Sequence, residues 1–168
     1  MLHSFRWLIF MAAIAVCLLI ATTIEAVAPE IQDGGKFFSA AAVKKADERI
    51  REIYRKHGRD VLIETFGTVP TADAEQVERM DNEKRSAYFK QWAKARIQQR
   101  VVNGVYVMIC KEPRYLYVEV HEETKSPKFA PNTWSVLEET IRTELKANRF
   151  DAVLEQSLRQ VEAQLSKK

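Results

Sequence analysis

The residues best suited to chemistry follow two predicted strands. Lys111, Glu112 and Arg114 surround the turn of a predicted hairpin, and Thr68 follows the strand that precedes it in the sequence. Ligands of open α/β sheets bind beyond the carboxyl ends of parallel strands, so we expect these side chains at one such edge. If the loop 33–35 folds over that edge, it adds the carboxylate of its first residue and free backbone N–H groups.

Four of these residues suit an anion. Lys111 and Arg114 can hold a phosphate through charge-assisted hydrogen bonds. Gly35, with an accessible backbone N–H, and Thr68, with its hydroxyl, are the further candidates for anion binding. Together they predict a phosphate-binding edge, while the alternative is that charged side chains in these turns are simply solvated.

The two carboxylates suit a hard cation. Asp33 and Glu112 are the candidate metal ligands and the candidate catalytic residues, because calcium binds carboxylate oxygens. Two carboxylates alone make a poor calcium site, and further oxygen ligands would have to come from backbone carbonyls. Calcium is therefore the only cofactor that the residues suggest, and it would assist a phosphatase-type hydrolysis.

Composition and motifs exclude several classes. The net charge of +3 is spread along the chain without a dense block of Lys or Arg, which argues against a nucleic-acid binder. No phosphate-binding P-loop, Gly-x-Ser-x-Gly elbow or His-Glu-x-x-His helix is present. Cys110 ends the apolar run VYVMIC and is predicted to be a buried small hydrophobe.

The amino terminus resembles an export signal. Arg6 precedes an uncharged apolar segment, residues 7–20, and Ala26-Val27-Ala28 supplies the small residues that a signal peptidase reads. The apolar stretch extends to about residue 24, so an uncleaved membrane anchor is the alternative. Both predict a leader over residues 1–28 and a domain over 29–168 that lies in the periplasm or on the extracytoplasmic face of a membrane.

Hydrophobic periodicity predicts an α/β fold. Apolar residues recur at helical spacing in four segments and fill three short strands, in the order helix, strand, helix, strand, strand, helix, helix. The helices are predicted near 40–57, 81–101, 134–145 and 151–165, and the strands at 61–66, 105–110 and 115–120. A crossover helix between the first two strands implies a parallel pair, and the KEPR turn implies an antiparallel hairpin. We therefore expect a three-layer α/β/α sandwich with a small mixed sheet of three to four strands.

Several local motifs in this order resemble the TPM domain family, which includes thylakoid-lumen photosystem repair proteins, a receptor accessory protein and exported bacterial proteins. The motifs are IQDGGKFFSAAAV, HGRDVLIETF, NGVYVMICKEPR and NRFDAVLEQSL, together with Trp92, and they span residues 31–165. Two motifs depart from the family. Glu112-Pro113-Arg114 replaces the common Asp-Arg pair of the hairpin turn, and HEETKSPKF replaces a Gly-rich stretch.

The resemblance implies two functions. Some plant members are described as calcium-binding acid phosphatases, and other members look like accessory factors of membrane complexes. We expect an exported module that assists a membrane protein or complex, with a weak calcium-assisted acid phosphatase as the alternative. If the leader is not cleaved, residues 7–24 would also contact the membrane directly.

Overall fold

The computed structural model describes residues 28–121, 124 and 133–167. Residues 1–27 of the predicted leader, with the predicted membrane contact at 7–24, lie outside this part. The elements follow the order β1 (Gln32–Asp33), α2 (Ala40–His57), β2 (Asp60–Thr68), a 3-10 turn (Thr71–Asp73), α3 (Ala74–Glu78), α4 (Asn82–Arg100), β3 (Gly104–Glu112), β4 (Tyr115–Val120), α5 (Thr133–Lys146) and α6 (Phe150–Leu165).

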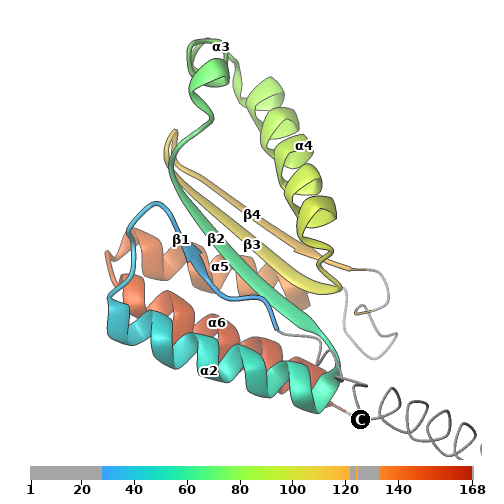
Figure 1. Ribbon diagram of the computed structural model, residues 1–168. Coiled ribbons are helices and arrows are strands. Elements are labelled where there is room, and N and C mark those ends of the chain that lie inside the picture. Colours follow the sequence, from blue (N-terminus) through green and yellow to red (C-terminus); the bar gives the residue numbers. More distant parts are fainter. Residues whose placement is uncertain (1–27, 122–123, 125–132, 168) are drawn as a thin grey trace, which may run out of the picture.

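The four strands form one mixed sheet in the order β1-β2-β3-β4 (Figure 1). β1 and β2 are parallel, β2 and β3 are parallel, and β3 and β4 form the antiparallel hairpin. Every predicted helix and strand is present, within a few residues of its expected bounds. The sequence did not indicate β1, because its two residues are too few for a hydrophobic pattern, nor the short helix α3.

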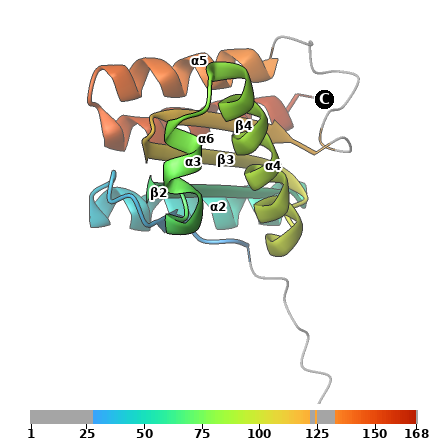
Figure 2. The ribbon, with the colours of Figure 1, turned by 90° about the horizontal axis from the view of Figure 1, so that it is seen from above.

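Helices cover both faces of the sheet, which confirms the three-layer sandwich (Figures 1 and 2). On one face, α2, α5 and α6 pack against alternate residues of the two central strands. These residues are Val61 and Ile63 in β2 and Val105, Val107 and Ile109 in β3. On the other face, α3 and α4 pack against the intervening residues, among them Leu62 and Met108. This alternation decides on which side of the sheet each polar residue lies.

The ends of α2 are fixed by the residues that the sequence indicates. Ser39 caps the first turn, since its Oγ accepts the N–H of Ala42 at 3.2 Å, and Gly58 ends the helix with a left-handed φ of 62°.

The start of α6 differs from the predicted start of the last helix, because α6 begins at Phe150. Asp151, at the start of the predicted helix 151–165, lies inside the first turn of α6 and accepts the N–H and Oγ–H of Ser39 at 2.9 and 2.7 Å. It therefore ties α6 to the start of α2.

No helix within the described ranges is long and apolar enough to span a membrane.

Candidate functional site

Asp33 holds the loop that follows β1. Its Oδ1 accepts the hydroxyl of Thr65 at 2.5 Å and the N–H of Phe37 at 3.0 Å, and its Oδ2 accepts the N–H of Phe38 at 3.0 Å. The loop thus folds over the carboxyl half of β2, as the sequence allowed. Both carboxylate oxygens are engaged by the protein itself, which gives Asp33 a structural task.

Lys111 and Gly35 meet above the same edge. The Nζ of Lys111 donates to the carbonyl of Gly35 at 3.0 Å and lies 5.0 Å from the centre of the Phe37 ring. The N–H of Gly35 is not free for an anion, however, because it donates to Oγ1 of Thr65 at 2.9 Å and to the Thr65 carbonyl at 3.1 Å. The structure thus brings Lys111 and Gly35 together, and the contact joins the lysine side chain to the backbone carbonyl of the loop.

Asp33 and Glu112 lie on opposite faces of the sheet. Asp33 is in register with Thr65, on the face covered by α2, whereas Glu112 is in register with Thr68, on the face covered by α4. The hydroxyl of Thr68 donates to the carbonyl of Val69 at 3.0 Å. This geometry does not bring the two carboxylates to one cation.

Arg114, the last of the predicted candidates, lies in the turn between β3 and β4 and is exposed. Within residues 28–121, 124 and 133–167, no group of three or more His, Cys, Asp or Glu side chains is arranged to hold a metal ion. The proposed roles of the six candidates in phosphate and calcium binding stay predictions.

Glu64 forms a buried charge cluster that the sequence analysis missed. Its side chain is 1% exposed. The carboxylate accepts two hydrogen bonds from the Arg96 guanidinium, one of them from Nε at 2.8 Å. It accepts a third hydrogen bond from the hydroxyl of Tyr106 at 2.8 Å. Nε of Arg100 lies 3.4 Å from the same carboxylate. A carboxylate within an otherwise apolar strand is the signal that could have indicated this cluster, because buried charges require partners.

The cluster sets the protonation of its members. Burial raises the pKa of Glu64, but the hydrogen bonds from Arg96 and Tyr106 and the charges of Arg96 and Arg100 outweigh it and hold that pKa below its usual value. Burial and the neighbouring Glu64 carboxylate raise the pKa of Tyr106. Glu64 is therefore charged and Tyr106 neutral near pH 7, and one carboxylate faces two guanidinium groups.

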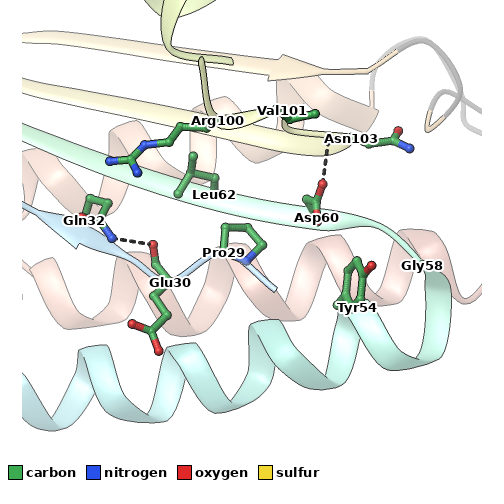
Figure 3. A pocket seen from close by; sticks show the side chains of 10 residues that line it. All are labelled: Pro29, Glu30, Gln32, Tyr54, Gly58, Asp60, Leu62, Arg100, Val101 and Asn103. Atoms are coloured by element: carbon green, nitrogen blue, oxygen red, sulfur yellow. Dashed lines mark hydrogen bonds between the residues drawn. The ribbon is translucent and has the colours of Figure 1, made fainter. Parts of the chain in front are cut away.

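A groove lies at the other end of the sheet, beside the start of β2 (Figure 3). Its volume is about 460 Å³. Leu62 lines it from β2, while Pro29, Glu30 and Gln32 line it from the segment that leads into β1. The ends of α2 and α4 supply the remaining residues, which are Tyr54, Gly58, Asp60, Arg100, Val101 and Asn103.

The charged residues of this groove differ in how well they are neutralised. Glu30 pairs with Arg51 at 3.7 Å, and Asp60, at the start of β2, accepts the backbone N–H of Asn103 at 2.7 Å. Arg100 makes no hydrogen bond to any described residue, and its side chain is 44% exposed. Among the residues that the structure describes, the carboxylate within ion-pair distance of it is that of Glu64, at 3.4 Å, which Arg96 already bonds. One positive charge is thus in excess beside the groove.

Val101 ends α4 in an unfavourable conformation. Its φ is 54°, in the left-handed region that glycine normally occupies at this position and that a β-branched residue rarely adopts. The side chain is 81% exposed, so burial does not compensate for the strain. The predicted helix ended near residue 101, but its pattern did not indicate a left-handed residue there. A valine where a helix-ending glycine is expected was the available signal.

The fold and the charge distribution define an α/β sandwich domain with polar groups at both ends of its sheet. The family model of the TPM domain matches residues 31–164, and the chain belongs to this family. The resemblance inferred from the motifs is thereby confirmed. No curated protein matches the chain.

Solved structures share the fold at low sequence identity. The N-terminal domain of the cg2496 protein from Corynebacterium glutamicum is 10% identical, with 89% of each chain covered and a TM-score of 0.59. The N-terminal domain of a P. gingivalis protein is 13% identical, with 80% of each chain covered and a TM-score of 0.53. The BA42 protein of Bizionia argentinensis is 13% identical over 78% of this chain and 83% of that one, with a TM-score of 0.53. These likenesses support the sandwich fold.

Proposed function

We propose that the chain is an exported TPM-domain protein that acts as an interaction module for a membrane protein or membrane complex. The observation that carries this proposal is the use of Asp33. Its carboxylate accepts three hydrogen bonds, from two N–H groups of the loop and from the hydroxyl of Thr65, and these give it a task in holding the loop. Its intended partner, Glu112, belongs to the opposite face of the sheet.

The amino-terminal sequence supports the compartment. An uncharged apolar segment at 7–24 follows Arg6, as in a secretory signal or a membrane anchor. If that segment stays as an anchor, it ends five chain steps before Pro29, which lines the groove. Fully extended, they reach at most about 17 Å, so the groove would be close to the membrane surface.

A phosphate-ester assay tests the alternative function. The exported protein is incubated with p-nitrophenyl phosphate, with and without calcium, beside the double variant Asp33→Asn with Glu112→Gln. We expect no turnover that the double variant removes, and no calcium-dependent rise in melting temperature. Turnover that requires both carboxylates and calcium would establish the weak acid phosphatase in place of the interaction module.

Affinity purification from membranes tests the interaction. The full chain with a carboxyl-terminal tag is expressed in its own host and purified after mild detergent treatment. We expect a membrane protein to co-purify in fixed stoichiometry with the tagged chain, and not with an exported control domain carrying the same leader and tag. Repeated recovery of the chain alone from intact, cross-linked membranes would contradict the proposal.

A further inference from the structure

We infer that the groove beside Arg100 and Val101 binds a peptide segment of the membrane partner that presents an acidic side chain next to an apolar one. This inference rests on the proposed function and names its binding site and the chemistry of the segment. The site is at the amino end of β2, opposite the edge where ligands of such sheets are usually expected.

Charge selects an anionic partner. The lining carboxylates of Glu30 and Asp60 have partners within the protein, Arg51 and the N–H of Asn103. Arg100 keeps a charge that Glu64 cannot neutralise, because Arg96 already makes two hydrogen bonds to that carboxylate. A planar guanidinium with unused N–H groups binds a carboxylate with two parallel hydrogen bonds.

The surroundings select an apolar neighbour for that carboxylate. Val101 exposes its side chain directly beside Arg100, and Leu62 and Pro29 line the same groove (Figure 3). The backbone N–H of Val101 caps α4, but its side chain is 81% exposed and adds little to stability in the free protein. Strained residues of this kind concentrate at binding sites, where the conformation serves recognition.

Short peptides provide a direct test. The isotope-labelled exported protein is titrated with acetyl-Val-Glu-Val-amide and, as the matched control, with acetyl-Val-Gln-Val-amide, and followed by NMR. We expect saturable shifts of the amide signals of Leu62, Val101 and Asn103 with the glutamate peptide, and about fivefold weaker binding of the glutamine peptide, as for one partly exposed charge pair. Equal binding of both peptides, or shifts scattered over the surface, would overturn the inference.

Two variants separate binding from folding. Arg100→Gln should remove the preference for the glutamate peptide while Arg96 keeps Glu64 paired. Val101→Gly should weaken binding of the same peptide and yet raise the melting temperature by about 2–4 °C, since it relieves strain. Binding that is unchanged in both variants would contradict the assignment of the site, whatever their stability.

The membrane purification distinguishes this inference from the proposed function. If wild type and Arg100→Gln recover the same partner equally well, the interaction module stands and the groove is not its binding site. If neither recovers a partner, the proposed function fails, and the peptide titration still decides whether the groove recognises a carboxylate.

Discussion

The two ends of the sheet use their charged residues in different ways. At the carboxyl end, Asp33 and Lys111 are bonded to the loop that closes over the strands. At the amino end, Arg100 remains without a hydrogen bond to the described residues, beside an exposed and strained Val101. The polar groups at the carboxyl end stabilise the fold. At the amino end, the charge of Arg100 and the apolar side chain of Val101 are not used in this way.

This difference shows why the position of a charged residue in a fold does not by itself identify a site. The carboxyl end has the residue types that chemistry requires, but its Asp33 is engaged in holding the structure together. The amino end has fewer such residues, and its excess charge appears only when the partners of each group are counted. Accounting for hydrogen bonds therefore separates structural from functional charges.

The largest expected effect is at Glu64. Replacing it with alanine leaves the Arg96 guanidinium and the Tyr106 hydroxyl without their acceptor and removes the anionic neighbour of Arg100, which we expect to lower the free energy of unfolding by about 3 kcal/mol. Urea denaturation measures this loss. The matched control is Glu138→Ala, which breaks an exposed pair with Arg142 on α5 and should cost less than about 1 kcal/mol. Equal costs would mean that the cluster does not anchor α4.

The same cluster gives a pH dependence. The pKa of Glu64 is lower in the folded protein than its usual value of 4.5, so its contribution is fully present above that value. As the pH falls below 4.5 and through the folded pKa, the carboxylate takes up a proton and the contribution is lost. Unfolding measured from pH 6 to pH 3 should show this decline in the wild type and a smaller one in Glu64→Gln. Parallel curves would contradict the assignment.

The amino end also has the tightest backbone contact. A Cβ at Gly104 would lie 1.9 Å from the carbonyl oxygen of Asp60, so Gly104→Ala should destabilise the protein by about 2–3 kcal/mol. Gly67, in the carboxyl half of β2, has no atom within 4 Å of the same position, and Gly67→Ala should change stability by less than about 1 kcal/mol. Thermal unfolding of both variants checks the contrast, and a tolerated alanine at 104 would count against this strand geometry.

At the carboxyl end, the prediction separates Asp33 from Glu112. Asp33→Ala removes the acceptor of three hydrogen bonds and should lower stability by about 2 kcal/mol. Exposed Glu112→Ala should change it by less than about 0.5 kcal/mol. Chemical denaturation without added calcium distinguishes the structural role. If Asp33→Ala is neutral until calcium is added, Asp33 is a metal ligand after all.

The smallest effect has the opposite sign. Val101→Gly relieves the strain of a left-handed valine and loses little buried surface. Glycine also gives the unfolded chain more entropy, which reduces the benefit, and we expect the free energy of unfolding to rise by about 1 kcal/mol. Differential scanning calorimetry measures it. Val136→Gly changes another exposed valine, 55% exposed, within the regular helix α5 and should instead lose about 1 kcal/mol. A loss at both positions would show that Val101 is not strained.

Much of the fold could be predicted because it follows from local patterns. Ile50 and Ile53 recur at helical spacing, and the apolar run 105–110 gives a strand that is buried on both faces. The left-handed Gly58 ends α2 where the sequence indicates. β1 could not be predicted, because it consists of two residues and its pairing depends on β2, which lies on the other side of α2 in the sequence.

The site could be predicted only in part, because hydrogen-bond partners depend on tertiary contacts. The sequence placed the loop 33–35 near Lys111, but it could not show that Asp33 would be engaged by Thr65. It also could not place the two carboxylates on opposite faces, since that requires the exact register of β1. The excess charge of Arg100 emerges only from the contacts between α4 and β2.

The most direct test of the account compares the two ends of the sheet in the cell. A benzophenone side chain is installed either at position 101, beside the groove, or at position 114, in the hairpin turn, and the exported protein is irradiated in intact membranes. We expect a cross-link to a membrane protein from position 101, and we expect Arg100→Gln to remove it. From position 114 we expect no cross-link. A cross-link from position 114 alone, unaffected by Arg100→Gln, would contradict the account.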